Sequence, residues 1–432
     1  MRLLLLIPLL LLPFIQIKAQ RISDRQMARQ ITRIKAFQKG NIAIALNKIK
    51  TSKAVVSYNE DSYMTPASNV KLITFLGAIQ NFDALPNLEF FKETDSITHF
   101  RSTGYPLLLH PLYEDLGLTD YLKQQQQLVY HPTEKVMERF GAGWSWDDYN
   151  YYFAAETSRF PIYGNVIQLE TTTSSQTVQV HPTYFAKHII KDTLKNAPKI
   201  KRLEHKNQFR INPKKWSAPQ TRYTPFRTGD SLFVELLSDA IQRPIRFASS
   251  DEQTPVWKTL YAKQPDSLYH ALLRDSDNLV AESLLLMIAK KRTDTLATNK
   301  AIRLLQSDWK AFLPDPLIWV DGSGVSRYNM VTPRSLVAVL EQIHQRIGME
   351  EIKKFFPAAT LTGIKKDPWG GDQPYVYAKT GTLRHNLTLS GYLLGRKNTP
   401  YAFSIMVNHV SAPNAEVRKG IGSLLAYLRK KL

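Results

Sequence analysis

A serine and a lysine stand three residues apart in Ser68-Asn69-Val70-Lys71, directly before the apolar run from residue 72 to 76. Once a helix begins, residues with this spacing lie on one face, so the amine of Lys71 can reach the hydroxyl of Ser68. A serine hydroxyl is a weak nucleophile and needs a neighbouring group to take its proton. A lysine can do so when burial lowers its pKa, and the apolar run supplies such surroundings. The stretch therefore predicts an activated serine at the start of a buried helix.

Two further motifs follow in order along the chain. An S-D-N motif occupies residues 276–278, and a K-T-G-T motif occupies residues 379–382. The ordered set S-x-x-K, S-D-N and K-T-G is the one that penicillin-binding proteins and serine β-lactamases use. A second S-x-x-K match, Ser307 with Lys310, is interpreted as fortuitous. The order of the motifs indicates Ser68 as the nucleophile.

The N-terminal residues 1–19 differ in composition from the rest of the chain. Arg2 precedes a leucine-rich run that Pro8 and Pro13 interrupt, and the run ends near Ala19. The pattern predicts a secretory signal peptide cleaved after Ala19 and a periplasmic enzyme. An uncleaved membrane anchor is the alternative reading of the same residues.

The composition excludes several kinds of chemistry. The 432 residues include no cysteine, which rules out disulfides, thiolate catalysis and zinc–cysteine sites. The ten histidines show no H-E-x-x-H or comparable spacing, so we expect no metal and no cofactor. The formal net charge of +20 fits either a solvated basic surface or attraction to an anionic cell envelope. Export and the absence of a nucleic-acid motif argue against nucleic acid as a partner.

The second motif begins 208 positions after Ser68 (276 − 68), much farther than in single-domain serine β-lactamases. The intervening sequence is irregular, punctuated by proline, and contains β-prone runs such as residues 177–181. We therefore expect a separate, mainly β insertion. The expected units are a signal peptide at 1–19, a catalytic domain at 20–80 and 246–432, and the insertion at 81–245.

With the motifs in place, the chain resembles the class C low-molecular-mass penicillin-binding proteins, the D-alanyl-D-alanine carboxypeptidase/endopeptidase family. The stretches similar to family sequence are residues 66–72, 143–148, 276–282, 321–329 and 378–392. The resemblance implies an α/β (α+β) transpeptidase fold of the penicillin-binding protein and serine β-lactamase type. That fold has an antiparallel sheet flanked by helices, here with the mainly β insertion. A long insertion is itself a family trait, and the resemblance implies that residues 81–245 are built as two small domains.

The resemblance also implies acyl transfer through an acyl-enzyme, with roles for eight residues. The implied catalytic residues are Ser68 as nucleophile, Lys71 as its base and Ser276 as proton relay. The implied substrate-binding residues are Asn278, Lys379, Thr380, Gly381 and Thr382. Backbone N–H groups of Ser68 and Thr382 would hold the oxyanion. The implied partners are peptidoglycan stem peptides, with β-lactam antibiotics as acylating inhibitors.

Several alternatives remain open from the sequence. A serine β-lactamase would share the motifs but needs an efficient deacylating water, and the long insertion argues against it. A non-catalytic envelope-binding homologue would be expected to lose motif residues, and none is lost here. Residues 321–326 fit a structural Gly-rich turn as well as a substrate contact, and residues 143–148 fit a structural role better than a catalytic one. The sequence leaves the balance between carboxypeptidase and endopeptidase open.

Overall fold

The computed structural model describes residues 21–132, 137–171, 178–216, 219–248, 256–262, 266–359 and 374–432. The expected signal peptide, residues 1–19, lies outside these residues. In the described part of the chain, no helix is both long and apolar enough to cross a membrane.

The part of the chain expected to form the catalytic domain, called the catalytic half below, is organised around a five-stranded antiparallel sheet. The strand order is β14-β15-β16-β1-β2. Its strands are β1 (Asn41–Lys48), β2 (Lys53–Tyr58), β14 (Val376–Leu383), β15 (Asn386–Leu394) and β16 (Pro400–Asn408). Strands β15 and β16 are buried along nearly their whole length, because helices cover the sheet. The N-terminal strand β1 pairs with β16 near the C-terminus, with Ile44 opposite Ile405. Both ends of the chain therefore build one sheet.

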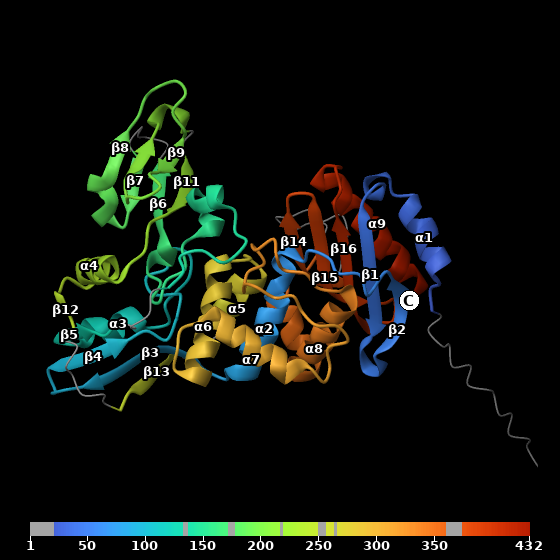
Figure 1. The fold of residues 1–432 in the computed structure, drawn as a ribbon, viewed down its shortest axis with the longest axis horizontal. Helices are drawn as coiled ribbons and strands as arrows, with labels where there is room; N and C mark the ends of the chain where they lie inside the picture. The colour runs from blue at the N-terminus through green and yellow to red at the C-terminus, as the bar shows by residue number, and fades with distance from the viewer. Residues whose placement is uncertain are drawn as a thin grey trace, which may run out of the picture.

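Helices surround this sheet, as predicted. They are α1 (Asp24–Thr32), α2 (Val70–Asn81), α5 (Asp266–Leu273), α6 (Asn278–Thr293), α7 (Thr298–Trp309), α8 (Pro333–Phe355) and α9 (Asn414–Lys431). Helix α8 packs on β1, β15 and β16, while α9 packs on β15. Figure 1 shows α2, α5, α6 and α7 between the sheet and the inserted region. Helix α2 is buried from Val70 to Ile79, so it forms the centre of the helical layer.

The insertion contains two modules, one nested inside the other. The first is a five-stranded sheet in the order β12-β5-β4-β3-β13 with helices α3 (Leu118–Gln124) and α4 (Asp230–Ile241). Its strands are β3 (Leu85–Lys92), β4 (Ile97–Arg101), β5 (Gln127–Tyr130), β12 (Ile245–Phe247) and β13 (Lys258–Ala262). Since β13 pairs with β3, this sheet continues past the limit of 245 expected from the sequence, as far as Ala262.

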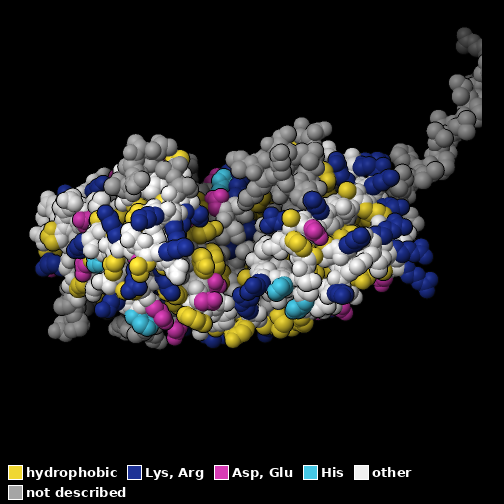
Figure 2. Space-filling view, turned by 90° about the horizontal axis from the view of Figure 1, so that it is seen from above, with side chains coloured by type: hydrophobic (Ala, Val, Ile, Leu, Met, Phe, Trp, Pro, Cys, Tyr) yellow, Lys and Arg dark blue, Asp and Glu magenta, His cyan; other side chains and the backbone are white. Residues whose placement is uncertain are grey.

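The second module lies between β5 and α4 in the sequence and consists of two three-stranded sheets, β11-β6-β7 and β8-β10-β9. Its strands are β6 (Val166–Thr171), β7 (Val178–His181), β8 (Ile189–Lys191), β9 (Ile200–Arg202), β10 (Phe209–Ile211) and β11 (Gln220–Pro225). In Figure 1 this module stands at the end of the molecule away from α1 and α9. Figure 2 shows Lys and Arg side chains spread over both halves of one face, in keeping with the basic composition.

Candidate active site

Ser68 lies in a short 3-10 turn, η3 (Ala67–Asn69), that leads directly into α2. The Nζ atom of Lys71 lies 3.3 Å from the Oγ atom of Ser68, so the predicted pairing on one helical face is present. Ala67 adopts a left-handed conformation with φ of 47°, an unusual backbone state for a residue with a side chain. Such local strain is typical of functional turns, where the surrounding fold holds the backbone.

Lys71 is completely buried behind the half-buried Ser68. Its Nζ atom also donates to the side-chain Oδ1 atom of Asn278 at 2.5 Å and to the carbonyl oxygen of Ser323 at 2.7 Å. Burial lowers the pKa of Lys71 from 10.5 to about 8, although nearby carboxylates oppose the shift. A lysine with this pKa is uncharged in a useful fraction of molecules near neutral pH, so it can accept a proton from the serine.

Ser276 lies on the turn between α5 and α6, and its φ of 61° is again left-handed. Asp277 caps α6 by accepting a hydrogen bond from the backbone N–H of Val280 at 2.9 Å. The Oγ atom of Ser276 lies 2.8 Å from Nζ of Lys379, which joins the second motif to the third. The turn thus places a hydroxyl beside a buried cation.

The third motif is on β14, the edge strand of the catalytic sheet, and Asn69 ties it to the nucleophile turn. The Asn69 side-chain amide donates to the carbonyl oxygen of Lys379 at 2.8 Å. Gly381 faces the same turn, and a Cβ atom there would lie 3.1 Å from the backbone nitrogen of Ser68 and closer still to Pro66. Glycine is therefore required at this position for the strand to approach Ser68 closely.

The loop at residues 321–329 is built around the buried carboxylate of Asp321. Its oxygens accept hydrogen bonds from the backbone N–H groups of Gly324 at 2.9 Å and Ser326 at 2.6 Å, and from the side-chain amide of Asn329 at 2.7 Å. The indole of Trp144 also donates to this carboxylate at 2.9 Å. The sequence left open whether residues 321–326 and 143–148 have a structural role or contact the substrate. The contacts of Asp321 and Trp144 are structural, whereas Gly324 lines the cavity above Ser68.

Sequence reasoning assigned no role to Glu282, which is buried on α6. Its carboxylate accepts backbone hydrogen bonds from Gly322 at 3.0 Å and Ser323 at 2.9 Å. Burial, and next the neighbouring charge of Asp321, raise the pKa of Glu282 to about 7. Glu282 therefore holds the loop whose Ser323 carbonyl binds Lys71. The sequence carried two signals for Glu282: its place in an otherwise apolar stretch, and its position at the end of the family-like residues 276–282.

Ser68 opens into a cavity of about 520 Å³. The lining combines motif residues with residues of the inserted region and of the 321–329 loop; it includes Ser68, Ser145, Asp147, Asp148, Tyr152, Phe153, Ser276, Asn278, Gly324, Val325, Arg327 and Thr382. The carbonyl oxygen of Phe153 accepts a hydrogen bond from the side-chain amide of Asn278 at 2.6 Å. That bond orients the Asn278 oxygen toward Lys71. The inserted region therefore forms one wall of the site.

The second S-x-x-K match lies away from the site, whereas Thr380 lies on the strand that carries the third motif. Ser307 and Lys310 are exposed at the end of α7 and do not join the motif residues. Thr380 is half-buried on β14 between Lys379 and Gly381. Within the described ranges, no group of three or more His, Asp or Glu side chains is placed to hold a metal ion.

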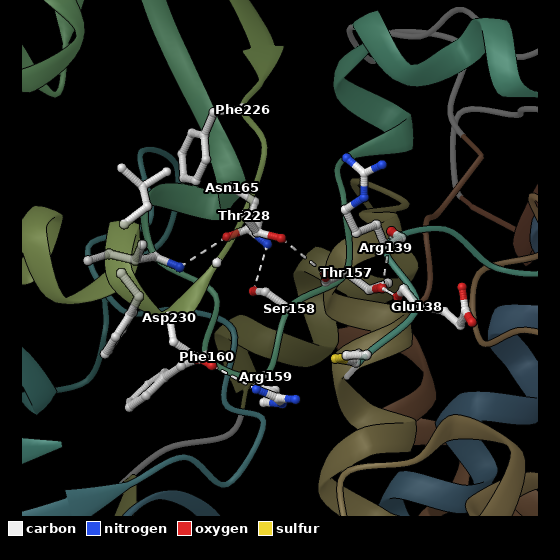
Figure 3. Close-up of a pocket in the computed structure, with 15 residues that line it drawn as sticks. Glu138, Arg139, Thr157, Ser158, Arg159, Phe160, Asn165, Phe226, Thr228 and Asp230 are labelled. Carbon is white, nitrogen blue, oxygen red and sulfur yellow. Dashed lines mark hydrogen bonds and ion pairs between the residues drawn. The ribbon is translucent and has the colours of Figure 1, made fainter. Parts of the chain in front are cut away.

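A separate cavity of about 420 Å³ lies at the junction of the inserted modules (Figure 3). In it, Arg159 pairs with Asp230 at 2.7 Å, and the Asn165 amide donates to Ser158 at 2.9 Å. Its lining includes none of the motif residues. These polar groups stabilise the junction between the modules.

Comparison with known families gives one match that spans most of the chain. The family model of the D-Ala-D-Ala carboxypeptidase 3 (S13) family matches residues 24–96 and 127–428. The two matched ranges include all three motifs.

Individual relatives give the same picture. D-alanyl-D-alanine carboxypeptidase DacB of Haemophilus influenzae is 25% identical over 441 residues, covering 90% of each chain. A penicillin-sensitive carboxypeptidase A of Dictyostelium discoideum is 32% identical over 124 residues, which is 26% of this chain and 23% of that protein.

Solved structures establish the fold. The structure of penicillin-binding protein 4 (dacB) from Haemophilus influenzae superposes with a TM-score of 0.73 at 18% identity, covering 94% of this chain and 99% of that one. A predatory endopeptidase from Bdellovibrio bacteriovorus superposes with a TM-score of 0.52 at 14% identity, covering 90% and 94%. The fold predicted from the resemblance is thereby confirmed.

Proposed function

The chain belongs to the D-Ala-D-Ala carboxypeptidase 3 (S13) family, and we propose that it hydrolyses D-alanyl peptide bonds of peptidoglycan stem peptides through an acyl-enzyme on Ser68. The observation that carries this proposal is the buried Lys71 amine, which contacts the Ser68 hydroxyl at 3.3 Å and has a pKa of about 8. A buried amine of this kind has the proton affinity that a general base needs near neutral pH.

The reaction proceeds in two steps. The Oγ atom of Ser68 attacks the carbonyl carbon of the penultimate D-alanine while Lys71 takes the hydroxyl proton. The C–N bond breaks, and the departing amine receives through Ser276 the proton that Lys71 took from Ser68; Ser276 is held by its hydrogen bond from Lys379. Water then adds to the ester carbonyl, the carboxylic acid is released, and the Ser68 oxygen takes back a proton from the attacking water.

One feature of the site favours a substrate with a terminal carboxylate, and another favours an extended peptide. The Lys379 ammonium donates to Ser276 within the site, so its charge lies beside the position of the leaving residue. Gly381 brings β14 close to Ser68, so an extended peptide can lie along this edge strand. The backbone N–H groups of Ser68 and Thr382 would hold the oxyanion, and each such donor typically contributes about 3 kcal/mol to lowering the barrier.

The acidic and basic side chains of the cavity would face the remainder of the stem peptide. Asp147, Asp148 and Arg327 line it together, and the pKa of Asp148 is raised by burial and then by Asp147. An arrangement with both signs of charge suits a side chain that carries an amine and a carboxylate. The same open cavity accommodates a terminal D-alanine or a cross-linked D-alanyl residue, so we propose both carboxypeptidase and endopeptidase activity.

Labelling with a fluorescent penicillin tests the proposal. Purified protein is expected to become stably labelled, and Ser68→Ala is expected to abolish the label while leaving the fold intact. Ser307→Ala, on an exposed helix end, serves as the matched control and should label like the unaltered protein.

Other outcomes would replace the proposal. Rapid consumption of penicillin without accumulated label would favour the serine β-lactamase alternative. Absence of any reaction by the folded protein would leave the non-catalytic binding alternative. The periplasmic location that the substrate requires is part of the proposal and is tested by fractionating cells that express the full chain.

A further inference from the structure

Three exposed aromatic side chains stand on one short segment of the inserted region, formed by the 3-10 turns η4 (Trp146–Asn150) and η5 (Tyr152–Ala154). Trp146 is 75% exposed, Tyr151 is 56% exposed and Tyr152 is 63% exposed. Large rings of this kind are usually buried, and exposed groups of them mark binding surfaces.

These rings line a groove of about 730 Å³ between the η4–η5 segment and the second inserted module. The opposite wall carries Lys199, Lys201, Arg222 and Tyr223, from the start of β9 and from β11. Figure 1 shows the teal segment that follows β5 lying between β11 and the helices of the catalytic half. The groove is therefore walled by aromatic rings on one side and mainly by cations on the other.

The wall of the groove is fixed by hydrogen bonds to β9. The Asn150 side-chain amide donates to the carbonyl oxygen of Ile200 at 3.2 Å, and its oxygen accepts from the backbone N–H of Arg202 at 2.7 Å. The buried guanidinium of Arg202 donates to the carboxylate of Glu156 at 3.2 Å. A ligand in this groove would meet a preformed surface and would lose little free energy in ordering it.

The charge of the groove favours an anionic ligand. Lys199, Lys201 and Arg222 face only two carboxylates in the lining, Asp147 and Glu204. Across the ranges that the structure describes, none of the three cations forms an ion pair with a carboxylate. Lys199 and Arg222 line the same groove, and the like charge of Arg222, after burial, lowers the pKa of Lys199. Unneutralised neighbouring cations attract carboxylates.

The groove adjoins the active-site cavity, and Asp147 and Tyr152 line both. Tyr152 lines the groove, the cavity above Ser68, and a third cavity of about 500 Å³ that also includes Ser276. The Tyr151 ring stacks on Phe153 with centroids 5.5 Å apart. The Phe153 carbonyl in turn accepts the hydrogen bond from Asn278 described above.

We propose that this groove is a glycan subsite, in which the amino-sugar end of a muropeptide lies while its D-alanyl end is at Ser68. The aromatic side chains pack against the apolar faces of the sugar rings, and the cations bind carboxylates of the acidic peptide attached to the sugar. The subsite rests on the proposed function for the identity of the substrate and adds recognition of the glycan to it.

Binding to the full-length Ser68→Ala protein, measured by titration calorimetry, tests the subsite without turnover. The two ligands are a disaccharide-pentapeptide and the same pentapeptide without sugars, and we expect the first to bind about tenfold more tightly, the effect of one or two well-placed aromatic contacts. Trp146→Ala should remove most of this difference, because Trp146 is assigned to the sugars. Lys201→Gln should weaken the binding of both ligands alike, because both carry the peptide carboxylates. Tyr261→Ala and Lys258→Gln, at exposed positions of β13, are the matched controls and should leave the affinities of both ligands unchanged.

Two results would overturn the subsite. The first is equal binding of the two ligands, or binding of neither. The second is an equal loss of affinity for both ligands in Trp146→Ala, which would place peptide rather than glycan in the groove. Hydrolysis of the sugar-free pentapeptide by Trp146→Ala in the otherwise unaltered enzyme should proceed at the normal rate. If the unaltered enzyme fails to hydrolyse that peptide, the proposed function fails, while the binding comparison still decides the subsite.

Discussion

The pH dependence of acylation follows from the buried environment of Lys71. A pKa of about 8 means that roughly one tenth of the molecules carry the uncharged amine at pH 7, and roughly nine tenths do at pH 9. If only the uncharged form takes the proton of Ser68, the second-order rate constant for acylation rises about tenfold between these pH values. Fluorescent penicillin labelling followed over time from about pH 6 to about pH 9.5 measures this rate, with the spontaneous loss of drug subtracted at each pH.

Asp277→Asn perturbs this profile in a known direction. The negative charge of Asp277 raises the pKa of Lys71, so its removal should lower that pKa and shift the rising limb to lower pH. Asparagine caps helices about as well as aspartate, so the α6 cap to Val280 should survive. Asp275→Asn is the matched control, because Asp275 lies in the same turn but is not among the charges that shift the pKa of Lys71; its limb should stay in place.

Two results would refute the reasoning. A rate that is flat over the whole range would mean that Lys71 does not act as the base in its uncharged form. A shift of the Asp277→Asn limb to higher pH would mean that the electrostatic account of the Lys71 environment is wrong.

Two substitutions test the close packing around the nucleophile turn. Gly324→Ala should lower the free energy of unfolding by about 1–3 kcal/mol and reduce penicillin labelling, since a Cβ atom would lie 1.9 Å from the carbonyl oxygen of Ala67. Gly348→Ala is the control, because Gly348 has a similar positive φ but open space around it, so its loss of stability in thermal unfolding measures the cost of the backbone conformation alone. Equal losses of stability in the two variants would contradict the steric argument. Asn69→Ala should cost about 1 kcal/mol in urea unfolding, because it removes a buried side-chain hydrogen bond to the carbonyl of Lys379. A variant as stable as the unaltered protein would show that water or another donor replaces the amide.

The sequence by itself determined the parts of the site that depend on local spacing and on motif identity. Ser68 and Lys71 meet because residues three apart share a helical face, and that relation holds wherever the helix is packed. The order of the three motifs was enough to prefer Ser68 over Ser307, and the family resemblance that the motifs carry was enough to predict the fold. The length between the motifs was enough to predict an insertion.

Only the tertiary structure decided which groups surround these residues. Lys71 bonds to Asn278 across 207 positions, and Lys379 bonds to Ser276 across 103, distances over which no sequence period specifies a contact. Glu282 acts on Lys71 through the backbone of the 321–329 loop, and strand β13 joins the sheet of the insertion by pairing with β3. Such contacts depend on how whole elements pack, because side-chain chemistry sets local conformation while the shared core sets which distant segments meet.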